Sequence, residues 1–160
     1  MEIICFHNPN EKYGFLSNWF HSKFVMDGVS FTSMEQFMMH QKASCFHDEM
    51  KAKEILETDD VAQIKELGRL VANYNDNLWG GIRQIVVYEG LIAKFSQDAK
   101  LKKQLLETKD AILAECAVKD CIWGIGRSMN DPKRFDITYW KGQNLLGYAL
   151  IAVRYKIRQL

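Results

Sequence analysis

The chain has 160 residues, of which 48% are hydrophobic, 12% aromatic and 26% charged, and its formal net charge is +1. This composition is typical of a globular protein, and the length suits one domain with a substantial core, so we expect a single domain over residues 1–160. A charge so close to zero argues against a broad nucleic-acid-binding face, which requires clustered basic residues.

Targeting signals and metal motifs are missing from the sequence. The first residues lack the basic and apolar regions of a signal peptide, and no apolar run approaches the length of a membrane span, so we expect a cytoplasmic protein without membrane contact. The histidines and cysteines form no HExxH or CxxC motif, so we expect neither a metal nor another cofactor and interpret the cysteines as reduced packing residues. The four cysteines are Cys5, Cys45, Cys116 and Cys121.

The N-terminal part predicts short strands. Residues 2–7 are rich in β-branched and aromatic side chains and read as a first strand. Two apolar runs, 24–26 and 29–31, flank Asp27–Gly28, a pair that accepts the positive φ angles of a type I′ hairpin turn.

The next part predicts helices. The pattern indicates helices over 33–44, over 48–57 with Asp48 as N-cap, and over 61–67 with Asp59 or Asp60 as N-cap. Gly68 then stands where a helix commonly ends in a left-handed residue.

The C-terminal half continues this pattern. We expect the longest helix over 82–95, with Ile82 and Ile85 on its apolar stripe, and further helices over 97–106 and 145–158. Residues 111–116 fit either a strand or a helix. The predicted fold class is therefore α+β, a single compact domain that is predominantly helical with a few short strands.

Glu35 stands at the start of the helix expected over 33–44 and has two interpretations. Either Thr32 or Ser33 can be the N-cap, and counting from Thr32 places Glu35 at the third helical position, where a capping-box glutamate belongs. Helical spacing, however, puts Glu35 on one face with Met38, Met39 and Lys42. If the methionines are buried, burial disfavours the charged form of this carboxylate, which is a property of catalytic acids and bases.

Other polar and aromatic groups gather in segments that do not read as core, and each also has a structural explanation. The asparagines can close turns, the tryptophans can be core residues, the arginine can bind helix C-terminal carbonyls, and the aspartate can cap a loop. Together they match a site for a flat heterocycle on a phosphorylated sugar, with aromatic rings to stack, cations for phosphate and carboxylates for bond cleavage. These residues are Ser17, Asn18, Lys42, Arg69, Trp79, Asp120, Trp123 and Asn144.

An ordered series of short motifs from about residue 13 to residue 154 resembles the NADAR family, the YbiA-like proteins. Two positions depart from the common pattern: Phe31, where many relatives have Trp, and Gln36, where many have His. The matching segments are 14–18, 33–36, 41–43, 67–69, 94–97, 105–108, Glu115, 120–126, 140–147 and Arg154.

The resemblance implies a YbiA-like fold and N-glycosidase activity on a phosphorylated N-riboside, such as the phosphoribosylamino-pyrimidine intermediates of riboflavin biosynthesis. On this hypothesis Glu35 stabilises the oxocarbenium-like transition state or orients water, and Asp120 protonates the leaving base or binds ribose hydroxyls. Lys42 and Arg69 hold phosphate. The heterocycle stacks on Trp79 and Trp123, and the sugar is oriented by Ser17, Asn18 and Asn144.

Two alternatives remain open from the sequence. One is an ADP-ribosyl hydrolase that acts on ADP-ribosylated nucleobases, with ADP-ribosylated nucleic acid as a partner; a single flipped nucleotide needs few cations. The other is a module that binds ADP-ribose or a related nucleotide without turnover. The sequence carries no signal for an oligomeric state.

Overall fold

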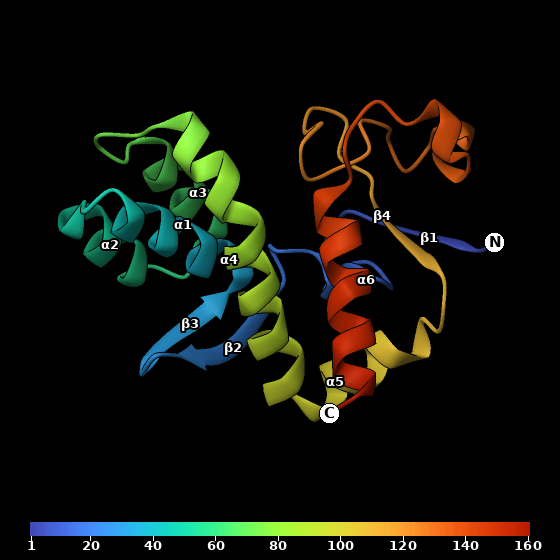
Figure 1. Ribbon diagram of the computed structural model, residues 1–160, viewed down its shortest axis with the longest axis horizontal. Helices are drawn as coiled ribbons and strands as arrows, with labels where there is room; N and C mark the ends of the chain where they lie inside the picture. Colours follow the sequence, from blue (N-terminus) through green and yellow to red (C-terminus); the bar gives the residue numbers. More distant parts are fainter. The chain divides into compact units, whose positions relative to one another are not determined.

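The computed structural model describes all 160 residues, which pack as two units. One unit is continuous and comprises residues 21–97, and the other combines residues 1–20 with residues 98–160. Each unit has its own strands and helices (Figure 1). We describe each unit by itself.

The unit of residues 21–97 is built on helix α1, which contacts three other helices and strand β3 (Figure 1). Helix α4 also contacts strand β2. Aromatic rings fill the space between the hairpin and α1: the Phe31 and Phe37 ring centroids lie 5.1 Å apart, and Phe24 lies 5.8 Å from each. The elements are β2 (His21–Met26), β3 (Val29–Ser33), α1 (Met34–Cys45), α2 (Glu49–Leu56), α3 (Val61–Arg69) and α4 (Asp76–Gln97).

Local sequence signals predicted the hairpin and two helix starts correctly. Asp27 and Gly28 have φ angles of 50° and 78°, as a type I′ turn requires, and Met26 pairs with Val29 across it. Asp48 accepts a hydrogen bond from the Lys51 amide and caps α2, and Asp60 caps α3 in the same way.

The glycine-based helix boundaries were wrong. Gly68 does not end α3 but lies inside it, because the Met39 side chain packs there: a Cβ on Gly68 would lie 2.0 Å from Met39 Sδ. Likewise α4 does not begin at Ile82 but at Asp76, and it runs through Gly80–Gly81.

The apolar stripe predicted for α4 ran through Ile82, Ile85, Val86, Ile92 and Phe95 and was right only in part, although Phe95 is buried. Ile85 is 60% exposed, whereas the buried face includes Val87, Gly90 and Leu91. Phe37 packs against Gly90, where an added Cβ would lie 2.5 Å from the ring. Contact with α1 therefore decides which face of α4 is buried.

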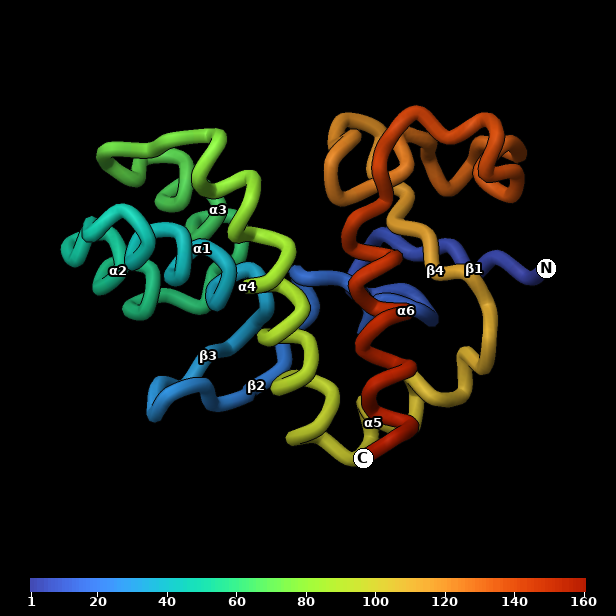
Figure 2. Tube along the Cα trace, viewed as in Figure 1, coloured from blue at the N-terminus to red at the C-terminus, as the bar shows by residue number.

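The other unit is organised around two parallel strands from distant parts of the chain, which lie side by side in Figure 2. Residues 111–116, open between strand and helix from the sequence, contain strand β4, and Cys5 pairs with Ala114. Helix α6 packs on β4 and contacts α5, and it has the bounds that the sequence predicted. The elements are β1 (Ile3–Phe6), α5 (Ala99–Glu107), β4 (Ile112–Glu115), α6 (Leu145–Arg158) and 3₁₀ turns at Gly14–Leu16, Pro132–Phe135 and Ile137–Tyr139.

Close backbone approach and one buried cation hold α6 against β4. A Cβ on Gly147 would lie 2.0 Å from the carbonyl oxygen of Leu113, so only glycine fits at this crossing. Farther along α6, the buried Arg154 guanidinium donates to Thr108 Oγ1 and to the Ala111 carbonyl, both at 2.8 Å. These contacts fix the segment that leads into β4.

The fold class expected from the sequence is confirmed. The structure has six α-helices and four short strands, which is an α+β arrangement dominated by helix. None of the helices combines the length and the apolar character that a membrane span requires.

Two glycine-to-alanine variants should change stability in opposite directions. Gly147→Ala places a methyl group against a backbone carbonyl that cannot move aside, and overpacking of this kind lowers the free energy of unfolding by about 1–3 kcal/mol. Gly81→Ala, inside α4 with nothing within 4 Å of the new methyl, should raise it by about 0.5–1 kcal/mol. Urea denaturation measures both values, and equal values would contradict the packing at Gly147.

Candidate functional site

The candidate site residues divide into two sets, and each set lies within one unit. Residues 21–97 carry Glu35, Lys42, Arg69 and Trp79, whereas the other unit carries Ser17, Asn18, Asp120, Trp123 and Asn144.

The start of α1 shows that Glu35 is not its capping-box residue. Ser33 is the N-cap, and its Oγ accepts a hydrogen bond from the Gln36 amide at 3.1 Å. Gln36 is therefore the third helical residue, and its Oε1 accepts from the Thr32 amide at 2.7 Å. The count from Thr32 was wrong, and of the two N-cap candidates Ser33 is confirmed. Both cap roles thus fall to other residues, which leaves Glu35 in the first turn, where the helix dipole favours its charge.

Gln36 also ties α1 to the end of α2. Its side chain is buried, and Nε2 donates to the carbonyls of Ile55 and Thr58 at 3.1 and 2.9 Å. All of these bonds lie within one helical turn of Glu35. They fix the backbone from which the carboxylate projects.

The buried stripe predicted around Glu35 is confirmed. Glu35 is 5% exposed, and Met38 and Met39 on the same face are buried as well. Lys42, one turn farther, is half-buried, and burial lowers the pKa of its ammonium. The charge of Glu35 raises that pKa and the charge of Arg69 lowers it, so the structure brings these three charged groups within electrostatic reach of one another.

Tyr74 joins this set, and sequence analysis missed it. Lys42 Nζ lies 4.5 Å from the centre of the Tyr74 ring, a cation–π contact, and the ring also packs against Phe46. The Ala72 amide donates to Asp48 Oδ2 at 2.9 Å, which fixes the loop that carries Tyr74. The sequence shows only a polar break at 73–77, and nothing there indicates that a ring would meet Lys42.

The two remaining members of this set differ in exposure. Trp79 is 4% exposed in the first turns of α4, which agrees with its structural explanation as a core residue. Arg69 lies at the end of α3, exposed, and forms an ion pair with Glu66. An exposed pair of this kind is weak, so the guanidinium is available to an anionic ligand.

Lys94 is a second residue that sequence analysis did not single out. Its side chain is completely buried in α4, with Nζ 5.0 Å from the centre of the Phe95 ring. Burial lowers the pKa of this amine to about 7. The helical pattern alone could not identify it, since a lysine on an apolar helix face reads as a residue whose charge reaches solvent.

In the other unit, Ser17 and Asn18 follow the 3₁₀ turn Gly14–Leu16. Ser17 Oγ accepts from the Trp19 amide at 3.1 Å. Asn18 is 7% exposed, and its Oδ1 is buried without a hydrogen-bond partner. Buried polar atoms are nearly always satisfied, so this oxygen is a natural acceptor for a ligand hydroxyl.

Asp120 and Asn144 both support backbone. Asp120 Oδ1 accepts from the amides of Ile122 and Trp123 at 3.0 and 2.9 Å, which is the loop-capping role that the sequence left open. Asn144, at a φ of 54°, binds strand β4 from the start of α6: Oδ1 accepts from the Glu115 amide and Nδ2 donates to the Leu113 carbonyl. Trp123 belongs to the loop that Asp120 holds, and its side chain is half-buried.

Glu115, the last residue of β4, is a buried acid whose pKa is raised. Its Oε1 lies 3.1 Å from His7 Nδ1, and its Oε2 is buried without a hydrogen-bond partner. Burial raises the pKa of Glu115, the hydrogen bond from His7 lowers it, and the charge of Asp120 raises it again. The hydrogen bond to Glu115 raises the pKa of His7 in turn.

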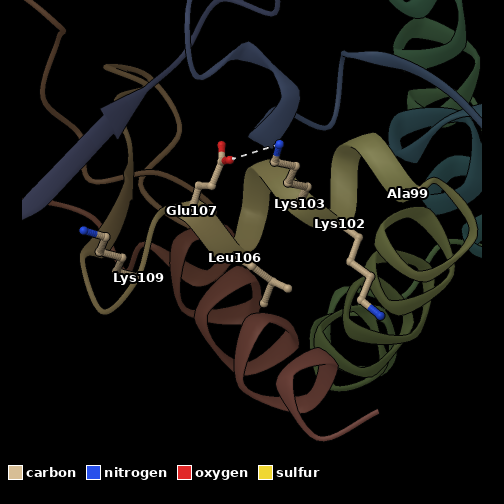
Figure 3. Close-up of a pocket in the computed structure, with 6 residues that line it drawn as sticks. All are labelled: Ala99, Lys102, Lys103, Leu106, Glu107 and Lys109. Atoms are coloured by element: carbon tan, nitrogen blue, oxygen red, sulfur yellow. Dashed lines mark ion pairs between the residues drawn. The ribbon is translucent and has the colours of Figure 1, made fainter.

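A surface hollow of about 540 Å³ lies along α5 and carries none of the candidate residues (Figure 3). Its Lys103 and Glu107 form a long ion pair of 3.9 Å on the helix surface. The lining residues are Ala99, Lys102, Lys103, Leu106, Glu107 and Lys109. Elsewhere, no three His, Cys, Asp or Glu side chains converge as a metal site.

Comparison with known proteins identifies the family. The NADAR domain family matches residues 5–158, which spans both units, and the chain belongs to this family. It is 36% identical to N-glycosidase R617 of Acanthamoeba polyphaga mimivirus, over 99% of this chain and 98% of that protein. It is 30% identical to N-glycosidase YbiA of Escherichia coli, over 95% of this chain and 86% of that protein.

The fold agrees with this assignment. The NMR structure of E. coli YbiA superimposes with a TM-score of 0.82 at 29% identity and covers 99% of this chain and 86% of that one. A third relative, riboflavin biosynthesis protein VVA0006 of Vibrio vulnificus, is 31% identical, but this chain spans only 39% of its length. The resemblance inferred from the ordered motifs is therefore confirmed.

Gln36→Ala should destabilise the protein. The change removes the acceptor of the Thr32 amide and the donor to two buried carbonyls, so the free energy of unfolding should fall by about 2–4 kcal/mol. Urea denaturation gives the value, and Gln84→Ala on the exposed face of α4 is the control that should change it by less than about 0.5 kcal/mol. A neutral Gln36→Ala would refute its capping role.

Lys94 should make stability rise with pH. Its pKa is about 7 in the folded chain and 10.5 when exposed, so the unfolded chain binds more protons between these values. The free energy of unfolding should therefore increase from pH 7 to 9, by at most about 1.4 kcal/mol per pH unit. Denaturation at several pH values should show a smaller rise in Lys94→Met than in the wild type or in the exposed control Lys100→Met. Parallel curves would contradict the prediction.

Proposed function

We propose that this protein is an N-glycosidase that hydrolyses the bond between the ribosyl anomeric carbon and a base nitrogen in a phosphorylated N-riboside. Membership of the NADAR family and two full-length relatives named N-glycosidase support the reaction. The name of the Vibrio relative favours a phosphoribosylamino-pyrimidine of riboflavin biosynthesis as substrate. The observation that carries the proposal is Glu35, a carboxylate buried on a methionine-lined face whose capping duties are performed by Ser33 and Gln36.

Hydrolysis develops positive charge on the ribose before water adds to the anomeric carbon. A carboxylate in a buried setting stabilises that charge more strongly than one in water, because little solvent competes for it. Glu35 performs this task, either directly or by orienting the attacking water. The Glu35 carboxylate is held in place beforehand by the bonds of Gln36, so little reorganisation accompanies the reaction.

The neighbouring cations define the phosphate-binding part of the proposal. Lys42 and Arg69 bind the phosphate, and the Tyr74 ring keeps the Lys42 ammonium in place through its cation–π contact. In the other unit, Asn18 accepts a hydrogen bond from a sugar hydroxyl, with Ser17 and Asn144 fixing the backbone around it.

The aromatic residues bind the base. Trp123 offers a half-buried indole on a loop that Asp120 holds by two hydrogen bonds, and we assign it to stacking on the heterocycle. Trp79 is buried, so it lines the site from the core and does not offer an open face for stacking.

The test is product analysis on a panel of N-ribosides, with Glu35→Gln as the central variant. Mass spectrometry of reactions with the riboflavin intermediates and with ADP-ribosylated guanine should show a free base and a ribose phosphate from the former. Glu35→Gln should lower kcat by at least about 100-fold and change the melting temperature little, since the capping hydrogen bonds of Ser33 and Gln36 are retained. The exposed Glu89→Gln is the matched control and should retain full activity.

Each other outcome has a definite meaning. Release of ADP-ribose from guanine alone would replace the substrate class while keeping the reaction. Tight binding of ADP-ribose without any product would overturn the enzyme proposal in favour of a binding module. A large fall in melting temperature for Glu35→Gln would assign this residue to helix stability.

A further inference from the structure

The carboxyl ends of the two parallel strands bring together an acid and a histidine that lie 108 residues apart in the chain. Glu115 is the last residue of β4, and His7 directly follows β1. Because the strands are parallel and in register, both residues emerge at the same edge. Their contact is direct, with His7 Nδ1 3.1 Å from Glu115 Oε1.

The backbone of Glu115 is held rigidly on both sides. Its amide donates to Asn144 Oδ1 at 3.0 Å, and its carbonyl accepts from the Ile125 amide at 2.8 Å. The side chain of Glu115 is 12% exposed, whereas the side chain of His7 is 54% exposed. One end of the pair is thus shielded and the other is open to solvent.

The two carboxyl oxygens of Glu115 differ in their partners. Oε1 is bonded to His7, and Oε2 is buried with no hydrogen-bond partner. An unsatisfied buried carboxyl oxygen is rare in native structures and costs free energy unless a ligand or a proton satisfies it. A carboxyl that is protonated at Oε2 presents a donor at this point.

Burial is the main effect that favours the protonated form of Glu115. Burial raises the pKa of Glu115, and Asp120 adds to this effect, while His7 opposes it. Glu11 acts on His7 and raises the pKa of the imidazole, and Arg134 faces the adjacent Cys116. A carboxylic acid with a raised pKa suits proton donation near neutral pH.

Asp120, the acid that the sequence favoured for this step, is arranged differently. Its Oδ1 accepts two backbone hydrogen bonds from the loop that carries Trp123. These bonds position the indole and use the carboxylate as an acceptor. Asp120 therefore acts on Trp123 and, through its negative charge, on Glu115.

We propose that Glu115 is the general acid that protonates the leaving base and that His7 returns a proton from solvent to Glu115. Asp120 is a positioning residue that holds the loop of Trp123. The inference rests on the proposed N-glycosidase activity. As the bond between the anomeric carbon and nitrogen breaks, its electron pair goes to the base nitrogen, which takes the proton from Glu115 Oε2. Water adds its hydroxyl to the anomeric carbon and loses a proton to solvent, and a proton from solvent passes through His7 to Glu115.

The test compares substrates that differ only in the leaving base. Wild type, Glu115→Gln and Asp120→Asn are assayed on ribosyl 5′-phosphates whose leaving nitrogens span several units of pKa. Without its acid catalyst, Glu115→Gln should lose about 10²–10⁴-fold in kcat/KM on the most basic leaving groups and little on the most acidic. Asp120→Asn should lose activity by a similar factor on every substrate.

His7→Asn keeps Glu115 in place and tests the reloading step. It should lower kcat on basic leaving groups, because the imidazole no longer supplies protons, and it should move the limb of the pH–rate profile that falls as pH rises to higher pH, because His7 no longer lowers the pKa of Glu115. It also serves if Glu115→Gln does not fold. An unchanged pH profile in His7→Asn would overturn the relay.

The inference and the proposed function fail in different ways. Hydrolysis by the wild type with an equal loss on all leaving groups in Glu115→Gln would overturn the inference alone. A leaving-group-dependent loss in Asp120→Asn instead would assign the proton to Asp120. No hydrolysis of any N-riboside by the wild type would overturn the proposed function and this inference with it.

Discussion

The hydrogen bonds of the Gln36 side chain determine which residues cap the start of α1. Gln36 binds the Thr32 amide and two carbonyls at the end of α2, and Ser33 binds the Gln36 amide in return. The N-cap hydrogen bond and the return bond from the third helical residue are thus made by Ser33 and Gln36. Glu35 can then remain buried beside Met38 and Met39 for a purpose other than helix capping.

Each unit contains one carboxyl group that is largely buried and is not simply paired with an opposite charge. In residues 21–97 this is Glu35, with Lys42 and Arg69 within electrostatic reach, and in the other unit it is Glu115, with His7 on one oxygen. Such groups destabilise a fold unless they are positioned by rigid neighbours, and here helix and strand ends provide the positions. Both carboxyl groups stand at the end of an element, Glu35 in the first turn of α1 and Glu115 at the end of β4.

Sequence patterns predicted what depends on neighbouring residues. The Asp27–Gly28 turn, the caps at Asp48 and Asp60 and the bounds of α6 all follow from local backbone chemistry. Features set by distant contacts were not predictable. Gly68 reads as a helix stop, yet it is an interior residue because Met39 from another helix packs on it.

The same distinction applies to the site. Glu35 became a candidate because its helix spacing places it on one face with two methionines, whereas Asp120 became the second candidate acid as one of the polar groups in segments that do not read as core. Such a position is a poor guide here, since backbone amides of the same loop engage the Asp120 side chain. Glu115 acquires its partner only when β4 pairs with β1 and brings His7 to the same edge. Glu115 is one of the positions that match the family motifs, but its contact with His7 depends on a parallel strand pair formed across more than a hundred residues, and the register of the two strands reveals it.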